Sequence, residues 1–550
     1  MNEVAPSNPT VTSPPVTRPA PARKRISLSS VAGLLVVTTL IGSLLGILRT
    51  KLVNGNFPAV GPTSTDAYFA AFNIPDFFFF TLAAGALGVA FMPVLADHLH
   101  RGDKRGMWDL SSSLMSFLSI IMAVVGLIIF IFAQPLIQHV VAPKLSPQQL
   151  HNAVTIMRFV AFNPLLFTIS GVLASTQQTM GKFFFYAIAP LFYNVSIIIS
   201  IFVFKNNIGL VGLGLGALIG GVLQLAIVAL GMLGTGYRFT PKILWQNADF
   251  RLILRQLPPR SLDQGIDQIE SIVETNFARR LGEGYISYYN NAYTLSTAPE
   301  LLIGTAISTA AFPRLAARLS QGRPDLFRRD FLMILRVIIW LAAPVALICY
   351  FCRGYFARMI YSNNSPQIAL IFGFLTAAIF FRTIYSIVSR WFYAQKDTKT
   401  PLFVSIFAIS LNVILAYFLS RPSSYGAAGL AIAQSGVAAA EVVVLFAIML
   451  IRDHKLFDAS FWSGCAKIVS VTGFSLVAGF IMVSIFPLGI NDRGIFTLGT
   501  KVVWIAGVMV AVHVFVSWLL GLEEVQPVLY RTRKIIRKVT RPVRQPFDVR

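Results

Sequence analysis

The amino-acid sequence predicts an all-α polytopic membrane protein with about fourteen transmembrane helices, arranged as two parallel six-helix lobes and a C-terminal helix pair. Of its 550 residues, 55% are hydrophobic and only 13% are charged, a balance typical of membrane proteins rather than soluble enzymes. Apolar runs of membrane-spanning length recur along the chain, and several short motifs of the first half return in the second half at a nearly constant spacing. These three observations define the predicted fold class.

The charge and cysteine content exclude several other classes of protein. The net charge of +23 comes from Lys and Arg in loops and tails, where they orient a membrane protein, so we expect no nucleic-acid partner. Three cysteines (Cys349, Cys352 and Cys465) are too few for a disulfide framework, and no His lies near them to complete a metal site. Without a nucleotide-binding loop, nucleophile elbow or zinc signature, we expect neither an enzyme nor a bound metal cofactor.

The expected elements follow in chain order. Residues 1–25 are rich in Pro, Thr and Ser and predict a disordered cytoplasmic tail. We expect the first lobe over 26–240, the second over 241–455, the helix pair over 456–522 and a polybasic cytoplasmic tail over 523–550. The apolar runs that predict the spans lie at 26–48, 67–95, 110–133, 151–177, 183–204, 208–235, 285–316, 332–352, 366–394, 401–419, 426–451, 461–487 and 496–520. The basic residues of the last tail, which we expect to hold anionic lipid head groups, are Arg531, Arg533, Lys534, Arg537, Lys538, Arg541 and Arg544.

One further span is predicted despite being acidic. Within residues 259–281, Asp263, Asp267, Glu270 and Glu274 recur at intervals of four, three and four along the chain, which places them on one face of a helix. An apolar stripe runs beside this face, and at ~1.5 Å per residue the segment is long enough to cross a bilayer. We expect it to cross with its acids facing a hydrated cavity.

The distribution of basic residues supports that crossing. Arg238, Lys242, Arg251, Arg255 and Arg260 precede the acidic segment, and a second basic loop follows the next apolar run. Both loops should be cytoplasmic, so an even number of spans must separate them, and only the acidic helix supplies the second. The alternative is a helix on the membrane surface, although anionic lipid repels an acidic face. With the crossing helix, both termini lie in the cytoplasm.

An internal repeat predicts the two lobes. Three short motifs recur in the same order: Pro93, Leu95, Ala96, Leu99 and Gly102 return as Pro313, Leu315, Ala316, Leu319 and Gly322; Gln177 and Asn194 return as Gln395 and Asn412; and Gly209, Gly212 and Leu213 return as Gly426, Gly429 and Leu430. The repeat unit contains six spans, an even number, so the two lobes have the same orientation in the membrane. Parallel repeats around a central site are typical of transporters that rock one lobe against the other.

Ionisable side chains inside membrane spans are costly, so each is a candidate functional residue. We interpret the acidic stripe as a cation or proton site that lines the central cavity, because hard cations select carboxylate oxygens. The alternative is that arginines such as Arg279 and Arg280 neutralise the stripe for structural reasons. For Arg158, Arg336 and Arg382, snorkelling or structural pairing is favoured over contact with a ligand.

Four stretches of the sequence resemble the MurJ/MviN family of the MOP exporter superfamily. They are TDAYFAAFNIPDFFFFTLAAGALGVAFMPVLADHL from Thr65, GKFFFYAIAPLFYNVSIII from Gly181, AISTAAFPRLAARLS ending at Ser320, and FYAQKDTKTP from Phe392. The resemblance extends over about residues 30–520 and implies fourteen spans. It also implies a flippase in the bacterial cytoplasmic membrane that moves lipid II by alternating access, with the last two helices forming a groove for the polyprenyl tail.

The resemblance also implies site residues. Arg49 matches an arginine at the end of the family's first helix, Asp66 matches the acid of the TDA motif, and Asn412 matches an asparagine linked to sodium binding in some members. The sequence departs from the family at several positions where cavity arginines or acids are usual, namely Ser43, Phe79, Ala84, Thr294 and Ala416. The pyrophosphate site must therefore be rebuilt from basic residues such as Arg49, Lys51, Arg260 or Arg382, or the substrate differs, or transport is lost.

Three hypotheses therefore stay open. The first is a monomeric lipid II flippase, with Arg49, Lys51, Asp66, Arg260 and Arg382 at the substrate. The second is an exporter of another polyprenyl-linked glycan or a small amphiphile. It would be coupled to sodium or protons through the acidic stripe and Asn412. The third is a transport-inactive membrane scaffold.

Overall fold

The computed structural model describes residues 28–84, 91–361 and 365–526, and within these ranges the regular structure is helical, without any strand. The predicted all-α class is confirmed. The predicted tail over 1–25 and the basic residues 531–544 lie outside the described residues.

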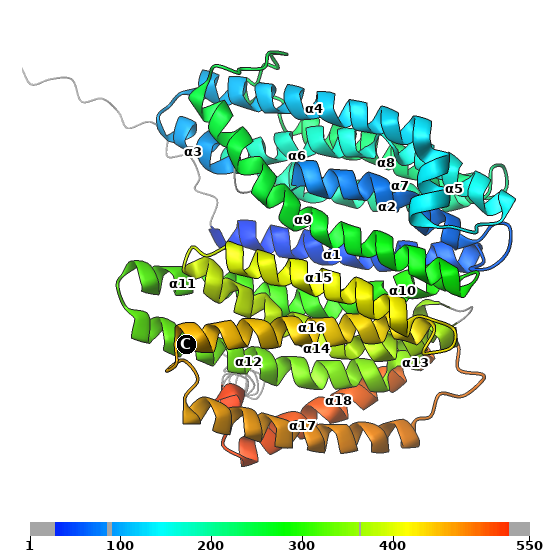
Figure 1. Cartoon of the computed structure of the whole chain (residues 1–550), viewed down its shortest axis with the longest axis vertical. Coiled ribbons are helices and arrows are strands. Elements are labelled where there is room, and N and C mark those ends of the chain that lie inside the picture. The colour runs from blue at the N-terminus through cyan, green and yellow to red at the C-terminus, as the bar shows by residue number, and fades with distance from the viewer. Residues whose placement is uncertain (1–27, 85–90, 362–364, 527–550) are drawn as a thin grey trace, which may run out of the picture.

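The first lobe contains helices that lie roughly side by side in the upper half of Figure 1. Their bounds are α1 (Leu28–Asn56), α2 (Thr65–Phe79), α3 (Met92–His100), α4 (Lys104–Pro135), α5 (Pro147–Val160), α6 (Asn163–Thr179), α7 (Phe184–Phe204) and α8 (Val211–Leu230). Helix α1 packs chiefly against α7, and α7 packs closely against α8. Serine and aspartate side chains cap several of these helices, as Asp103 does by accepting a hydrogen bond from the Gly106 amide at the start of α4.

The second lobe and the helix pair occupy the lower half of Figure 1. Their bounds are α10 (Tyr285–Glu300), α11 (Ala306–Ser320), α12 (Pro324–Phe351), α13 (Arg353–Ile360), α14 (Ser365–Ala394), α15 (Lys399–Leu419), α16 (Ala427–Arg452), α17 (Ala459–Ile485) and α18 (Ile495–Leu519). The short helix α13 was not predicted, because its sequence carries no long apolar run.

Eleven of the predicted spans are confirmed as helices that are long and apolar enough to cross a membrane, counted over the described residues. The other three are helical but lack one of those properties. Helix α9 (Ala248–Leu281) carries too many charges, the segment that contains α2 runs into residues 85–90, which lie outside the described residues, and the segment that contains α10 is not among the helices that meet both criteria. The exact count of fourteen crossings therefore stays a prediction.

The internal repeat is visible in the backbone. The π-helical turns Phe80–Ala84 and Leu301–Thr305 interrupt the second helical segment of each lobe, and their positions in the sequence follow the spacing of the repeated motifs. A π-turn inserts an extra residue into a helix and is often found at functional positions. Two such turns at equivalent places support the two-lobe interpretation.

Helix α9 lies between the lobes and contacts both (Figure 1). Phe250 and Ile253, near its start, are fully buried in a core made with residues of α4, α6 and α8. Its later turns pack against α2 on one side and α15 on the other. The helix therefore begins the second lobe in the sequence but is shared by both lobes in space, and this position brings its acids to their interface.

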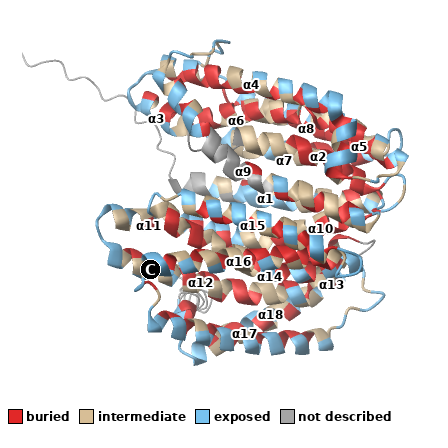
Figure 2. Cartoon of the chain, viewed as in Figure 1, coloured by how far each residue is buried: buried red, intermediate tan, exposed pale blue. Residues whose placement is uncertain are grey.

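The helix pair α17–α18 is fixed to the second lobe through α12. Trp340 Nε1 donates to Ser517 Oγ at 2.8 Å, and the His513 ring lies 3.1 Å from the Trp340 carbonyl and 3.0 Å from Ser475 Oγ. Figure 2 shows many exposed residues along α17. They include large apolar side chains such as Val469 and Phe480, which is the surface a lipid-facing helix requires.

Candidate functional site

Two carboxylates of the predicted acidic stripe meet polar residues of the second lobe. Glu270 and Glu274 lie one turn apart on α9 and are only 8% and 5% exposed. Asn412 of α15 donates through Nδ2 to Glu270 Oε1 at 2.6 Å and to Glu274 Oε1 at 3.2 Å. The structure thus brings together Glu270, Glu274 and Asn412 of the set that we expected at the ion site. The reason is that the later turns of α9 pack against α15.

A guanidinium and a second amide complete this group. Arg382 of α14 lies 3.7 Å from Glu270 Oε2 and donates to Gln434 Oε1 of α16 at 2.6 Å. Gln434 in turn donates through Nε2 to Glu274. The group thus contains two carboxylates and one guanidinium. When both acids are ionised, its net charge is negative, and this charge is buried. A buried charge of this kind favours uptake of a proton or a cation.

A cavity of about 240 Å³ opens beside these acids, lined by residues of α9, α10 and α14 that include Ser271, Tyr289 and Arg382. At ~30 Å³ per molecule of liquid water it has room for about eight waters, but it is too small for a large solute. Asn412 is 1% exposed, and in the described structure its Oδ1 has no hydrogen-bond partner. That oxygen is a free acceptor beside two carboxylates, a donor set suited to a small monovalent cation.

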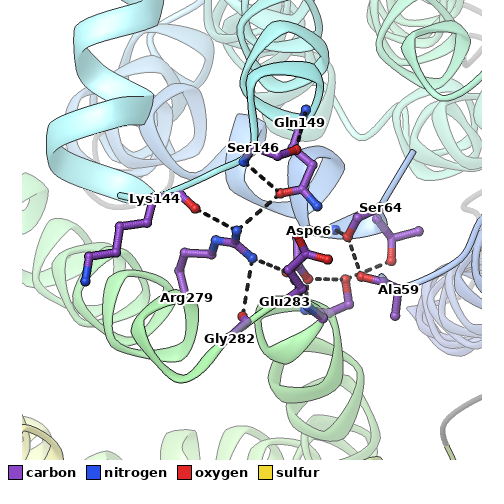
Figure 3. A network of polar contacts seen from close by, with 12 residues as sticks. Ala59, Ser64, Asp66, Lys144, Ser146, Gln149, Arg279, Gly282 and Glu283 are labelled. Atoms are coloured by element: carbon purple, nitrogen blue, oxygen red, sulfur yellow. Dashed lines mark hydrogen bonds and ion pairs between the residues drawn. The ribbon is translucent and has the colours of Figure 1, made fainter. Parts of the chain in front are cut away.

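Asp66 occupies a different place from the one expected for a substrate residue (Figure 3). It is fully buried at the start of α2, and the first turn of α10 encloses its carboxylate. The Gly284 amide donates to Oδ2 at 2.7 Å, and Ser287 donates to Oδ1 through its amide at 2.9 Å and its hydroxyl at 2.7 Å. A helix N-terminus stabilises a carboxylate in this position. Asp66 therefore joins the two lobes and does not line the cavity beside Glu274.

Arg279, at the end of α9, compensates the charge of Asp66. Its Nη1 lies 3.6 Å from Asp66 Oδ2, and its Nη2 donates to the Lys144 carbonyl at 2.7 Å and to Gln149 Oε1 at 3.2 Å (Figure 3). We call Asp66, Gln149, Arg279, Gly284 and Ser287 the outer latch, because the basic loops predict that this end faces outward. Arg279 neutralises Asp66 and not the acidic stripe, so the alternative assignment of Arg279 to the stripe is not supported.

The other predicted residues lie apart from one another. Arg49 and Lys51 are partly exposed on α1, and the charge of Arg49 acts on Asp76 of α2. Arg382 belongs to the carboxylate site described above. The side chains of Arg260, Asp263 and Asp267 lie outside the described residues, although their backbone is part of α9. The described part of the chain thus does not assemble the predicted cluster of basic residues.

Gln434 and Asp76 were missed in the sequence. Each is a lone polar residue within an otherwise apolar segment, and such residues in membrane spans commonly face a partner or a cavity. Gln434 could have been found by this criterion alone.

The described residues form a polytopic helical membrane protein of two lobes, with two buried carboxylates at the lobe interface. A solved structure described as a lipid II flippase MurJ in an inward closed conformation is similar, with a TM-score of 0.73 and 21% identity over 92% of this chain and 100% of that chain. An inward-facing multidrug transporter of the MATE family is also similar, with a TM-score of 0.63, 15% identity and coverage of 78% of this chain and 98% of that chain.

Sequence comparison gives the family. The family profile described as lipid II flippase MurJ matches residues 60–491, and the chain belongs to this family. A probable lipid II flippase MurJ of Buchnera aphidicola is 24% identical over 472 residues, which cover 84% of this chain and 90% of that protein. A probable lipid II flippase MurJ of Bdellovibrio bacteriovorus is 27% identical over 451 residues, covering 79% of this chain and 83% of that protein.

Proposed function

We propose that this protein translocates lipid II across the bacterial cytoplasmic membrane by alternating access, with both termini in the cytoplasm. The observation that carries the proposal is membership of the MurJ family over residues 60–491. The fold supports it, because two lobes joined at one end and sharing α9 can rock against each other around a central site.

The carboxylate site supports coupling of the movement to a cation. Glu270 and Glu274 come from α9, whereas Asn412, Gln434 and Arg382 come from three helices of the second lobe. Adding a positive charge to this group changes how strongly α9 is held to the second lobe. A proton on Glu274 and a sodium ion beside Asn412 Oδ1 both satisfy the geometry, and ion dependence distinguishes them.

An apolar groove supports a lipid substrate. A hollow of about 400 Å³ lies among α12, α14 and α17, and its lining is almost wholly apolar, with Ile339, Ala343, Leu347, Phe380 and Val469 among the residues that form it. An isoprenoid chain requires a surface of this kind, since burying apolar area against protein costs no hydrogen bonds.

A second candidate substrate is another polyprenyl-linked glycan. One argument for it is that Ser43 and Thr294 stand where the family usually has cavity arginines. Another is that Arg49 and Arg382 do not form one cationic cluster, because the charge of Arg49 acts on Asp76 whereas Arg382 pairs with Glu270. A head group with fewer or differently placed phosphates would need fewer cationic partners.

Complementation tests the proposed function. Expression of the full chain in cells depleted of their own MurJ should restore growth, and Arg49→Ala should abolish rescue. Failure of the wild-type chain to rescue, although it reaches the membrane, would favour the other glycan or a scaffold. Rescue by Arg49→Ala equal to the wild type would remove Arg49 from the substrate site.

Transport in reconstituted vesicles tests the coupling. Glu274→Gln should lower the rate of lipid translocation at least tenfold and abolish its dependence on the driving ion, because the neutral amide cannot take up a charge. Gln268→Ala serves as the matched control, because Gln268 lines the same cavity but carries no carboxylate, and it should keep the ion dependence. Unchanged ion dependence in Glu274→Gln would contradict the coupling role.

A further inference from the structure

The apolar groove described above extends beyond the hollow among α12, α14 and α17. A second hollow of about 480 Å³ adjoins it, and Tyr350 lines both. The same three helices continue along the path, with Val469 and Thr472 of α17 in the first hollow and Phe480 and Val483 in the second. From Ile339 to Tyr350 the path extends ~16 Å along α12, at ~1.5 Å per residue, toward the end of the molecule predicted to face outward.

The second hollow contains one charged side chain among the residues that line it, Arg353 at the start of α13. The other residues that line this hollow are apolar, aromatic or glycine, and they include Phe351, Pro487 and Leu488. A guanidinium therefore stands at the outer end of a continuous apolar path.

The contacts of Arg353 leave most of its donors available. Nη1 donates to the Tyr350 carbonyl at 2.7 Å, and the guanidinium carbon lies 4.5 Å from the centre of the Tyr350 ring. Within the described part of the chain we find no carboxylate paired with it. A guanidinium carries five N–H donors in a planar fork, so the arginine is oriented by Tyr350 and keeps donors for a phosphate.

Helix α14 makes room for this arginine at Gly373. A Cβ atom added at Gly373 would lie 2.7 Å from Arg353 Cδ and 3.2 Å from Nε, so any other residue would displace the side chain. The stem of Arg353 is therefore seated against α14, and its position depends on a residue that carries no charge itself.

We propose that the outer end of this groove binds a prenyl pyrophosphate lipid, with the chain along α12 and α17 and the pyrophosphate on Arg353. This inference rests on the proposed function and adds a site for the lipid on the outward side, where it would be held after translocation. An ordinary phospholipid also has an anionic head and apolar chains. The fork geometry and the length of the single path favour one long chain that ends in a pyrophosphate.

Photolabelling of the full-length protein tests the site. The probe is a prenyl pyrophosphate that carries a diazirine on its chain, added to protein in phosphatidylcholine nanodiscs, with peptide mapping of the label. We expect labelling on α12 and α17, lowered about tenfold by Arg353→Gln and clearly lowered by Gly373→Ala, which moves the arginine but keeps its charge.

The matched control is Arg358→Gln. Arg358 lies on the same short helix but donates through Nη1 to the Gly489 carbonyl at 2.5 Å, and it does not line the groove, so its replacement should leave labelling unchanged. Equal labelling of Arg353→Gln and wild type would overturn the site. So would equal labelling by the matched prenyl alcohol, or equal competition by phosphatidylglycerol, which would indicate an ordinary phospholipid.

Lipid II translocation by the same preparations separates this inference from the proposed function. Translocation by the wild type without Arg353-dependent labelling leaves the function in place and overturns the site. Arg353-dependent labelling without translocation supports the site as a prenyl pyrophosphate site and counts against the flippase.

Discussion

The two ends of the molecule are held together in different ways. At the outer end, hydrogen bonds join the first lobe directly to α10: Asn54 to Asn291 at 2.8 Å, Thr65 to Ser287 at 2.7 Å, and Asp66 to both Gly284 and Ser287. At the other end, which the basic loops predict to be cytoplasmic, Asp330 pairs with Arg314 and Arg318 of its own lobe, and Arg336 pairs with Glu524 beyond the helix pair. These ion pairs of the second lobe thus do not reach the first lobe, whereas the hydrogen bonds at the outer end join the two lobes directly.

Two equivalent positions of the repeat, one in each lobe, carry different side chains that hold the helices around them. His98 and Arg318 occupy matching places in the repeat, since each directly precedes the leucine that the repeat conserves as Leu99 and Leu319. Arg318 pairs with Asp330 of α12, whereas the ring of His98 lies 2.9 Å from Asp103 and 2.9 Å from Asp249 of α9. The brace that fixes the start of α9 to the first lobe is therefore made by an imidazole between two carboxylates, whereas the matching brace of the second lobe is made by a guanidinium.

For alternating access, the outer latch must break while the braces within each lobe persist. Replacement of latch residues should therefore change which side of the membrane the protein opens to, and replacement of the braces should not.

The largest effect is expected from Arg279→Ala. This change leaves Asp66 fully buried without its cation, and removing one partner of a buried ion pair costs about 3–5 kcal/mol. The outer end should open, so a cysteine at Ala67, which is buried beside the latch, should react with a membrane-impermeant thiol reagent. Arg280→Ala is the control, because Arg280 is the next residue on α9 but is exposed and donates to Asn276, which is not a residue of the outer latch. Equal reactivity in both variants would show that the latch does not close the outer end.

A smaller effect of the same kind is expected from Ser287→Ala. The Ser287 hydroxyl donates to Asp66 Oδ1 at 2.7 Å, and loss of one such bond to a charged group costs ~1.5–3 kcal/mol. The Ala67 cysteine should react at least tenfold faster than in the parent. Thr297→Ala removes a hydroxyl of the same helix that bonds only the Thr294 carbonyl, and it should leave the rate unchanged.

A smaller effect is expected at His98. Its ring nitrogens lie 2.9 Å from Asp103, which caps α4, and 2.9 Å from Asp249 of α9. His98→Gln disturbs both contacts, so hydrogen exchange at the start of α9 should be faster than in the wild type. Because the two acids are 48% and 41% exposed, solvent screens the contacts, and the effect should be smaller than that of Ser287→Ala. Equal exchange in both proteins would contradict this role of His98.

The smallest effect is expected from Asp397→Asn at the cytoplasmic end of the second lobe. Hydrogen bonds from Thr400 and Arg452 lower the pKa of Asp397 to about 2, outweighing its burial. Because its pKa is lowered in the folded state, the ionised carboxyl stabilises the fold at pH values above its ordinary pKa, which is about 4. This stabilisation is lost only as the pH falls toward ~2. Arg452 is 38% exposed, so the substitution should cost less than about 1 kcal/mol by thermal unfolding, with no dependence on pH between 5 and 8. A pH-dependent loss in that range would contradict this assignment.

The fold was largely predictable from the sequence because membrane spans carry a strong local signal. The length of the apolar runs predicted eleven helices that the structure contains, and the repeated motifs predicted two lobes of similar structure. The shared helical face of Glu270 and Glu274 was also anticipated from their spacing, and Asn412 was expected at an ion site from the family resemblance. The hydrogen bonds between Asn412 and the two acids became visible only in the structure.

The outer latch was not predictable, because it depends on how α2, α5 and α10 meet. The TDA motif marks Asp66 as an intramembrane acid, but nothing local shows that its partners are two amides and a hydroxyl from the far side of the lobe interface, at Gly284 and Ser287. The role of Arg382 was likewise open, because the sequence around an arginine in a membrane span does not show whether it binds a phosphate of the substrate or a carboxylate of the protein. In the structure it pairs with Glu270.

The most direct test of the latch compares both ends of the protein in one experiment. Spin labels at Val60 and Tyr425 report on the outer end, and labels at His100 and Gln321 report on the cytoplasmic end, all four being exposed. Pulsed electron paramagnetic resonance in nanodiscs should show that Arg279→Ala lengthens the outer distance and shortens the cytoplasmic one together. A longer outer distance with an unchanged cytoplasmic distance would mean that the lobes do not move as two bodies, and it would contradict the alternating-access account.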